Sequence, residues 1–421
     1  MTTISRRKFL ALGASTGAIA ASGYLLFDRN HQLITKIETS TNSITPTNHD
    51  VLVIFTLYGG NDGLNTIVPF TEPLYAKLRG SLALTQSDVT PLGKDDLYIN
   101  NSLANLTKLW NQDKVAIVAG VSYPNPILSH FVSMDIWQSG STDNSIETGW
   151  IGRYLDQLKS PTPTTAISIG TSVPPLAIGA STSASSLVST TPNPLPRLLD
   201  GQALTVLGNQ SKYQGMDSIY ASSISDLLTL DSDLTHLFAG DATKTPTTSL
   251  GTISNRAGGG ASSYSAGASK DAATIATLIN AGIDTRVFTF SMSGFDTHVN
   301  EAATHKADLK AADEAIASLF SNLTDTNRGR VTLLVYSEFG RRANVNGGGG
   351  TDHGTASVAF VVGDMVKGGI YGQYPSLSSL IDDNLKVTTD FRSIYAPLID
   401  TVLQGDSKTA LYGSYPNLTF V

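Results

Sequence analysis

Six short apolar segments, spread over the whole length of the chain, constrain its fold most. They are residues 51–57, 114–121, 166–170, 286–292, 331–336 and 357–362. Runs of this length that are apolar throughout and rich in β-branched residues are typical of strands buried on both faces of a sheet. They predict a mostly parallel central sheet.

Helical patterns separate some of these segments. Residues 272–281 have a helical pattern before the fourth segment, and residues 305–323 have one after it, with Leu309, Ala312 and Ile316 at spacings of three and four. Alternating strands and helices place helices on both faces of the sheet. We therefore predict a three-layer α/β sandwich formed by residues 50–421.

One region departs from this alternation. Residues 181–191 are rich in Ser and Thr, residues 256–270 are rich in Gly, Ser and Ala, and residues 218–238 between them have a helical pattern. We interpret about 180–270 as a Ser/Thr/Gly-rich insertion in the sheet domain. The polar, Thr-rich residues 29–49 are predicted to be a linker.

The N-terminus carries an export signal. Ser5-Arg6-Arg7-Lys8-Phe9-Leu10 is a twin-arginine motif, and an apolar stretch rich in Ala and Gly follows it to Phe27. We predict a signal peptide over residues 1–28, export by the twin-arginine translocase, and a periplasmic or extracellular location. An uncleaved membrane anchor stays open, because Ala18-Ile19-Ala20, which fits a cleavage site, lies inside the apolar stretch.

Composition excludes several functions. The chain has no cysteine, which excludes disulfides, thiolate metal sites, iron–sulfur clusters and a cysteine nucleophile. Its net charge of -7 provides no basic excess to neutralise phosphates, so we expect no nucleic-acid partner. Any metal ion must be held by Asp, Glu, His or backbone oxygen atoms.

Acidic residues and histidines gather at the ends of the predicted strands, where ligands bind in open α/β sheets. The residues concerned are Asp62, Ser129, His130, Asp296, His298, Glu338, Arg341, Asp352 and His353. Taken singly, each has a simpler explanation as a turn residue, a helix cap or half of a surface ion pair. Together they are more informative, because carboxylates that converge repel one another unless a cation compensates them. This set predicts a site for divalent metal ions.

Motifs in the same order identify the chain as resembling a bacterial family, domain-of-unknown-function family 1501. The matching pieces are residues 5–10, 59–65, 129–131, 149–153, 294–298, 337–341, 350–354, 366–372 and 390–392. The activity of this family is not established. The resemblance therefore implies membership and export, and it implies no reaction.

A more distant resemblance, to the alkaline phosphatase and sulfatase superfamily, implies a chemistry. Asp62 after the first strand and Asp352-His353-Gly354 late in the chain carry it. The resemblance implies an alkaline-phosphatase-like sandwich with two divalent metal ions (Zn, Mg, Mn or Ca). It implies Asp62, Asp296, His298, Asp352 and His353 as ligands. From its place at a strand end, we expect Glu338 to bind the metal or to contact one of its ligands.

The same resemblance implies a nucleophile at a helix N-terminus. Ser129 is best placed for it, because it precedes a predicted helix over residues 130–138, and the adjacent His130 would be a ligand or base. Arg153 or Arg341 would bind the anion. The chain departs from the superfamily in the spacing of Asp296-Thr297-His298, since the superfamily pair is spaced Asp-x-x-x-His. It also has no histidine after His353, where the superfamily has a ligand, and either His130 or His305 could substitute.

The expected function is an exported metal-dependent hydrolase of phosphate or sulfate esters, acting on a small anionic ester or a polymer. Two alternatives stay open. The first is a non-catalytic metal-binding exported protein that binds a partner or envelope polymer. The second is a carbohydrate- or surface-binding protein in which the Asp and His residues are structural. In each case the membrane is a partner only through an uncleaved N-terminal segment.

Overall fold

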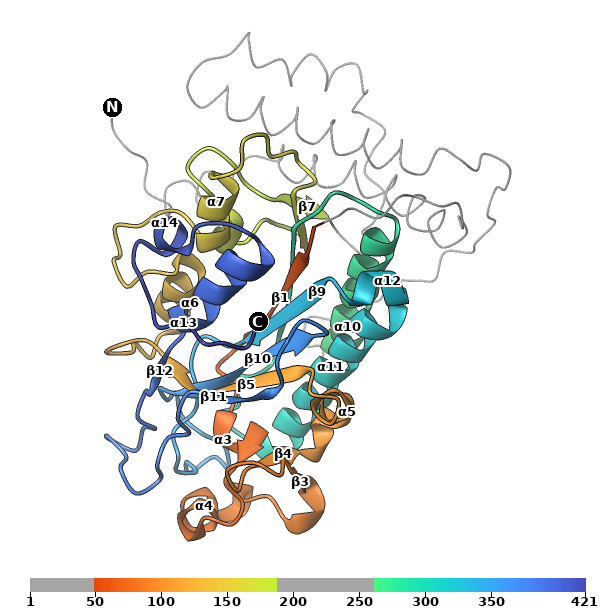
Figure 1. The fold of residues 1–421 in the computed structure, drawn as a ribbon. Coiled ribbons are helices and arrows are strands. Elements are labelled where there is room, and N and C mark those ends of the chain that lie inside the picture. The colour runs from red at the N-terminus through yellow and green to blue at the C-terminus, as the bar shows by residue number, and fades with distance from the viewer. Residues whose placement is uncertain (1–48, 188–260) are drawn as a thin grey trace, which may run out of the picture.

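The computed structural model of the protein describes residues 49–187 and 261–421 (Figure 1). The twin-arginine motif, the predicted signal peptide and the helix predicted over residues 218–238 lie outside the described residues. The predicted insertion is described only at its two ends. Within the described part, no helix combines the length and the apolar character needed to cross a membrane.

A nine-stranded sheet forms the centre of the molecule. Its strands are β1 (Val51–Tyr58), β5 (Val115–Ser122), β6 (Ala166–Ile169), β7 (Ser185–Leu187), β8 (Val287–Ser293), β9 (Val331–Tyr336), β10 (Ser357–Gly363), β11 (Gly369–Tyr371) and β12 (Thr389–Asp390). The order is β11-β5-β10-β9-β1-β8-β6-β7, and β12 pairs with β5. All six predicted strands are confirmed, and their ends differ from the predicted ends by one residue at most.

The direction of one strand decides where the later loops lie. β1, β8, β9, β6, β7, β5, β11 and β12 pair in parallel, whereas β10 runs antiparallel to both β5 and β9. The start of β10 therefore lies at the edge of the sheet where its neighbours end. The loop before β10 is brought to the same edge as the loops after β1, β5, β8 and β9.

Helices cover both faces of the sheet, as Figure 1 shows. On one face lie α5 (Ala104–Trp110), α10 (Ala261–Asn280) and α11 (Glu301–Asn322), packed on the β1 side chains Val51, Val53 and Phe55. On the other face lie α6 (His130–Ser139), α7 (Trp150–Leu155), α13 (Arg392–Pro397), a π-helical turn (Leu398–Val402) and α14 (Ser407–Leu411), packed on Leu52 and Ile54. Alternate residues of β1 thus face two cores, which confirms the three-layer sandwich with a mostly parallel sheet.

Elements that were not predicted lie between β1 and β5. A small sheet is formed by β2 (Ile67–Val68), β4 (Tyr98–Asn100) and β3 (Val89–Pro91), next to α3 (Gly63–Thr66) and α4 (Pro73–Arg79). α12 (Asp325–Arg328) precedes β9. Strands of two or three residues are too short for an alternating pattern to reveal them.

Candidate metal centre

Three loops at one edge of the sheet supply the side chains of the candidate site. Residues 123–129 connect β5 to α6, which begins at His130, residues 294–300 connect β8 to α11, and residues 337–356 connect β9 to β10. The chain turns sharply where β1 ends on the same edge. Gly59 has a φ of 121°, and a Cβ atom on it would lie 2.4 Å from the backbone nitrogen of Asp296. Only glycine permits this approach, which brings the end of β1 against the loop of Asp296.

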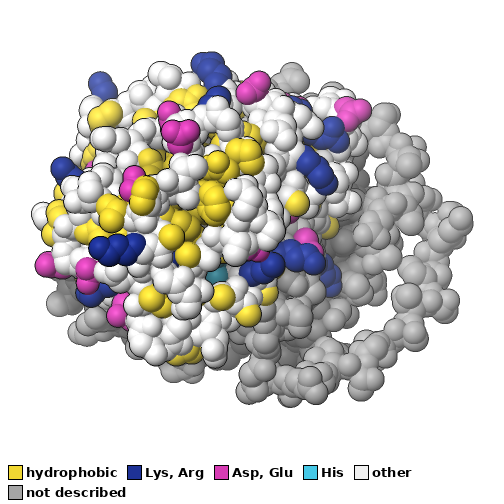
Figure 2. Space-filling view, turned by 90° about the horizontal axis from the view of Figure 1, so that it is seen from below, with side chains coloured by type: hydrophobic (Ala, Val, Ile, Leu, Met, Phe, Trp, Pro, Cys, Tyr) yellow, Lys and Arg dark blue, Asp and Glu magenta, His cyan; other side chains and the backbone are white. Residues whose placement is uncertain are grey.

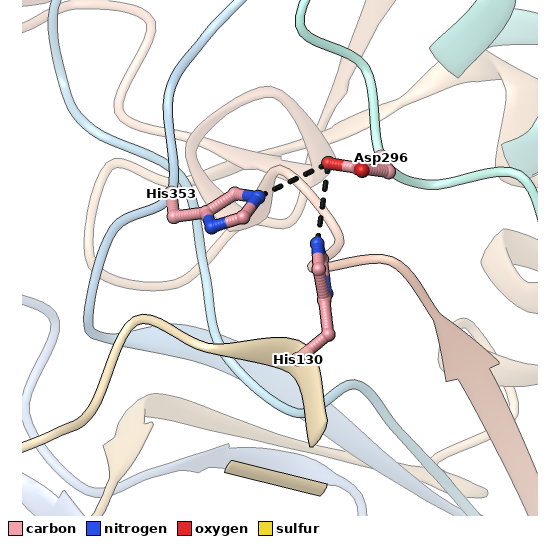
Figure 3. A group of neighbouring side chains, drawn as sticks. All are labelled: His130, Asp296 and His353. Carbon is pink, nitrogen blue, oxygen red and sulfur yellow. Dashed lines mark hydrogen bonds and ion pairs between the residues drawn. The ribbon is translucent and has the colours of Figure 1, made fainter. Parts of the chain in front are cut away.

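Two imidazoles and one carboxylate converge where these loops meet. The Nε2 atoms of His130 and His353 lie 3.4 Å and 3.2 Å from Oδ1 of Asp296. Figure 3 shows the two rings approaching Asp296 from different loops. The three ligand atoms lie within 4.8 Å of one another. Because all three residues are partly exposed to solvent, the group is open on one side.

A third imidazole adjoins this group. Nε2 of His298 lies 3.1 Å from Oδ1 of Asp296 and 2.9 Å from Nε2 of His353. The cluster of His130, Asp296, His298 and His353 is called the outer cluster below. Its members come from all three loops, so it forms only in the folded chain.

The Nδ1 atom of each histidine in the outer cluster faces an oxygen atom. Nδ1 of His130 lies 2.8 Å from Oε1 of Glu338, that of His353 lies 3.0 Å from the carbonyl of Leu128, and that of His298 lies 3.4 Å from Oδ1 of Asp352. An acceptor at Nδ1 places the proton there and leaves Nε2 with its lone pair. This arrangement is usual for histidines that bind a metal.

Glu338 is therefore placed behind the ligands. The prediction left open whether it binds the metal directly. Its Oε1 accepts hydrogen bonds from the backbone N–H of Gly59 and from His130, and its Oε2 accepts one from the Ser337 hydroxyl. The hydrogen bond with Glu338 raises the pKa of His130, and burial opposes this effect. Glu338 is a positioning residue for His130 in this geometry.

Arg341 holds the Asp296 loop in place. Its guanidinium is buried and donates to the carbonyls of Gly60, Thr351, Gly59 and Phe295, and to Oδ1 of Asp296 at 2.7 Å. Partial burial raises the pKa of Asp296, but the hydrogen bond and charge of Arg341, together with His130 and His353, lower it to about 2. The prediction that Arg341 binds a substrate anion is corrected, because its donors are already committed inside the protein.

Arg153 requires the same correction. It is buried, and it donates to the carbonyls of Ser139, Thr148 and Ala410 while its guanidinium lies over the ring of Tyr412. None of these partners belongs to the outer cluster. Arg153 links α7 to the end of α6 and to α14 through these hydrogen bonds. It therefore stabilises the packing of these helices and is not available to bind an anion.

Asp62 does not join the outer cluster, contrary to the prediction of one shared pocket. It caps α3 by accepting a hydrogen bond from the N–H of Leu64, and it forms an ion pair with Arg79 in which neither side chain is exposed. The turn at Gly59 and Gly60 directs it into the protein. Asp62 instead lies with Glu301 and His305, whose ligand atoms are all within 4.8 Å of one another. These three residues are called the inner cluster below.

The inner cluster contains two carboxyl groups and, among the described residues, only one cationic partner, Arg79, which pairs with Asp62. Burial and the charge of Asp62 raise the pKa of Glu301 to about 8, and burial lowers the pKa of His305 to about 4. At neutral pH, Glu301 is therefore protonated, His305 is neutral, and Arg79 balances the charge of Asp62. Glu301 was not among the predicted ligands, because the predicted helix began at His305, whereas α11 begins at Glu301 and places the two residues four apart on one face.

The remaining predicted residues lie at the border of the outer cluster. Ser129 is the N-cap residue of α6, directly before His130, and its side chain makes no capping hydrogen bond. Asp352 is about half exposed, and its Oδ1 accepts a hydrogen bond from Asn346 at 3.1 Å and faces His298. The hydrogen bond from Asn346 lowers the pKa of Asp352. Asp352 therefore supports His298 instead of joining the ligand atoms directly.

The donor set fits a divalent metal ion. Four ligands at about 2.0 Å in a tetrahedron are about 3.3 Å apart, since that spacing follows from tetrahedral geometry at usual Zn–N and Zn–O lengths. The observed distances of 3.4 and 3.2 Å from Asp296 to His130 and His353 are close to this spacing, and these three ligand atoms lie within 4.8 Å of one another. Nε2 of His298 lies 3.1 Å from Asp296, but its 2.9 Å to Nε2 of His353 is shorter than this spacing. Nε2 of His130 is buried and has no hydrogen-bond partner within the described part of the chain, as expected for an atom aimed at a ligand.

Comparisons with known proteins give a family and distant structural likenesses. Residues 117–399 match the model of the family described as "Protein of unknown function (DUF1501)". No curated protein matches the chain. The solved structures that match include an alkaline phosphatase superfamily protein from Vibrio parahaemolyticus, with 11% identity, a TM-score of 0.36, and 91% of this chain and 77% of that chain covered.

Two further solved structures match at similarly low sequence identity. Ps i-CgsB in complex with k-i-k-neocarrahexaose has 10% identity and a TM-score of 0.40, and the match covers 87% of this chain and 75% of that chain. Alkaline phosphatase from the Antarctic bacterium TAB5 has 12% identity and a TM-score of 0.27, with coverages of 77% and 95%. Likenesses at this level assign no activity and no ligand to this chain.

Proposed function

This chain belongs to the DUF1501 family of proteins of unknown function. We propose that it is an exported metal-dependent hydrolase of phosphate or sulfate esters. One observation carries the proposal. The Nε2 atoms of His130, His298 and His353 all lie within 3.4 Å of one carboxylate oxygen of Asp296, and the cluster is open to solvent. A ligand set that is open on one side is the usual form of a catalytic metal site, whereas structural sites are closed.

We propose one ion at the outer cluster in place of the two expected from the resemblance. The second ion would have used Asp62, which is fully buried and paired with Arg79. Imidazole and carboxylate ligands suit zinc or another divalent ion of similar preference. When bound, such an ion polarises an ester oxygen and activates a nucleophile.

The residues of the chain have distinct tasks in this proposal. His130, His298, His353 and Asp296 hold the ion, and Glu338 fixes the orientation of His130. Phe339 supports the site, because its ring lies 4.8 Å from that of His130 and 4.9 Å from that of His353. A bulky buried ring below two imidazoles restricts their rotation.

Arg342 takes the anion-binding task that was expected of Arg153 or Arg341. It is only partly buried, and its charge acts on Asp352, next to His353. Its Nε atom is buried and has no hydrogen-bond partner among the residues that the structure describes. A partly exposed guanidinium at the border of the site suits an anionic ester oxygen.

Ser129 is the proposed nucleophile. It directly precedes His130, and its hydroxyl is not used in capping α6. In the first step, the Oγ–phosphorus (or Oγ–sulfur) bond would form as the bond to the ester oxygen breaks, and the hydroxyl proton would pass to solvent. The leaving alcohol would take a proton from solvent. Water would then break the Oγ–phosphorus bond and restore the hydroxyl, releasing phosphate or sulfate.

The test compares hydrolysis of a panel of phosphate and sulfate monoesters by zinc-loaded wild type and Ser129→Ala, with and without chelator. We expect turnover by the wild type that chelator abolishes, and a loss of at least about 1000-fold in Ser129→Ala with its metal retained. Ser145→Ala, at an exposed serine, is the matched control. Metal binding without turnover of any ester would favour the non-catalytic metal-binding protein.

A further inference from the structure

Exposed large hydrophobic side chains are concentrated beside the outer cluster. Six such side chains occur among residues 49–187 and 267–421, whose side chains the structure describes, and four of them lie within three residues of His130 or next to His298. The four are Ile127, Phe131, Val132 and Val299, with exposed fractions of 43%, 89%, 36% and 60%. Scattered single exposed hydrophobic residues need no explanation, whereas a group at one place indicates a binding surface.

The four side chains are called the apolar rim below. Ile127 and Val299 lie on loops that border the site, and Phe131 and Val132 lie in the first turn of α6, directly after His130. The segment with Phe131 borders the site because the carbonyl of Leu128 accepts a hydrogen bond from His353. Val299 directly follows His298, and a β-bridge to Gly349 holds it beside the loop that ends at His353. Figure 2 shows a histidine side chain between hydrophobic side chains and a group of Lys and Arg side chains on the same face.

The apolar rim selects among ligands of the site. A free anion or a small polyol ester would leave Phe131 and Val299 in water. An alkyl or aryl group attached to the anion would cover them as soon as the anion reached the outer cluster, because each rim side chain is close in sequence to a ligand. Burial of such groups is favourable by about 0.8 kcal/mol for each CH2.

We propose that the site takes monoesters whose alcohol is an alkyl chain of several carbons or an aromatic ring. This inference rests on the proposed function and names its substrate class. The anion lies at the outer cluster, and the alkyl or aryl group lies on the apolar rim. The two parts are recognised separately, so removal of the rim weakens binding of the apolar group and leaves binding of the anion unchanged.

The test measures equilibrium binding of two phosphonates, which cannot be hydrolysed, to the zinc-loaded full chain by calorimetry. Hexylphosphonate and methylphosphonate carry the same anion and differ in their apolar part. We expect hexylphosphonate to bind the wild type at least about 10-fold more tightly, since several CH2 groups become buried. In the double variant Phe131→Ser with Val299→Ser, the two should bind within about 3-fold of each other, at the wild-type affinity for methylphosphonate.

Ile381→Ser is the matched control, because Ile381 is 61% exposed in a turn that carries no ligand. It should keep the preference for hexylphosphonate. Equal binding of both phosphonates by the wild type would overturn the inference and leave the proposed function standing. Binding of neither would contradict the proposed function itself. A dimer in the wild type that Phe131→Ser dissociates would assign the rim to a second copy and overturn the inference.

Discussion

Nδ1 of His130 lies 2.8 Å from Oε1 of Glu338, a carboxylate with an exposed fraction of 1%. The same oxygen accepts a hydrogen bond from the backbone N–H of Gly59, directly after the end of β1. Glu338 therefore joins β1, β9 and α6 at the point where His130 must face Asp296. A ligand held by a buried acceptor in this way loses little conformational freedom when a metal binds.

Glu338→Gln tests this relationship. The variant keeps an oxygen atom near His130 but removes the negative charge that favours the Nδ1 proton. We expect metal affinity to fall by about 10- to 100-fold, which is the usual effect of changing such a partner. The measurement is metal titration with a competing chelator. Glu314→Gln, at a half-exposed site on α11, should leave the affinity unchanged.

Arg341→Met removes the guanidinium that several buried carbonyls and Asp296 share. We expect the free energy of unfolding to fall by about 3–5 kcal/mol, because buried acceptors lose their donor. Denaturation in urea measures the change. Lys306→Met provides the comparison, since Lys306 is 70% exposed and its nearest carboxylate lies 3.9 Å away; a change below about 0.5 kcal/mol is expected. Equal losses in both variants would refute the structural role of Arg341.

Glu301 should make stability depend on pH. Its pKa is raised from 4.5 to about 8, so the folded state keeps a proton that the unfolded state releases. The contribution is full below pH 4.5 and is lost as pH rises to about 8, with a slope of at most about 1.4 kcal/mol per pH unit from this group. Glu301→Gln, which keeps the hydrogen-bonding positions, should flatten the free energy of unfolding between pH 6 and 8.

Asp308 supplies the control for this titration. It is buried on the same helix, and burial raises its pKa from 3.8 to about 6. Asp308→Asn should therefore flatten only the part of the profile between about pH 4 and 6. A wild-type profile that is level from pH 6 to 8 would show that Glu301 is ionised in the folded protein.

The sequence allowed the strands to be predicted, and it marked three residues of the outer cluster, for a simple reason. Each strand segment is apolar throughout, and Asp296, His298 and His353 lie next to such segments. His353 precedes its strand, so in an all-parallel sheet it would lie at the opposite edge. The antiparallel direction of β10 brings it to the edge where β8 ends. The loop that carries His353 therefore meets the loop that carries Asp296 only because β10 is antiparallel, and an apolar segment does not reveal the direction of its strand.

Asp62 and the two arginines were predicted to face the site, and the structure places them inside the protein. Asp62 pairs with Arg79, which lies on a short helix between two strands of a small sheet, in a region that has no clear sequence pattern. Arg153 and Arg341 were chosen for their charge, and whether a guanidinium faces substrate or backbone carbonyls is decided by packing. Phe131 and Val299 are ordinary core residues by type, and only their exposure marks them as a rim.

Export is tested separately from the site. Changing both Arg6 and Arg7 to Lys should block export, because the receptor of the twin-arginine pathway reads the paired guanidinium groups. Cell fractionation and immunoblotting of wild type and variant measure this. Lys8→Arg, which keeps the pair and the charge, is the control. Unchanged export of the double variant would remove the twin-arginine pathway from the account.

The central claim is that the outer cluster binds one divalent ion, and metal content of purified protein tests it most directly. Wild type, Asp296→Asn with His353→Gln, Glu301→Gln with His305→Gln, and His49→Gln are loaded with zinc, dialysed and analysed by mass spectrometry. The account predicts about one ion per chain in the wild type, in the inner-cluster variant and in His49→Gln, and almost none in the outer-cluster variant. Equal zinc in the outer-cluster variant and wild type, or loss of zinc only from the inner-cluster variant, would contradict it.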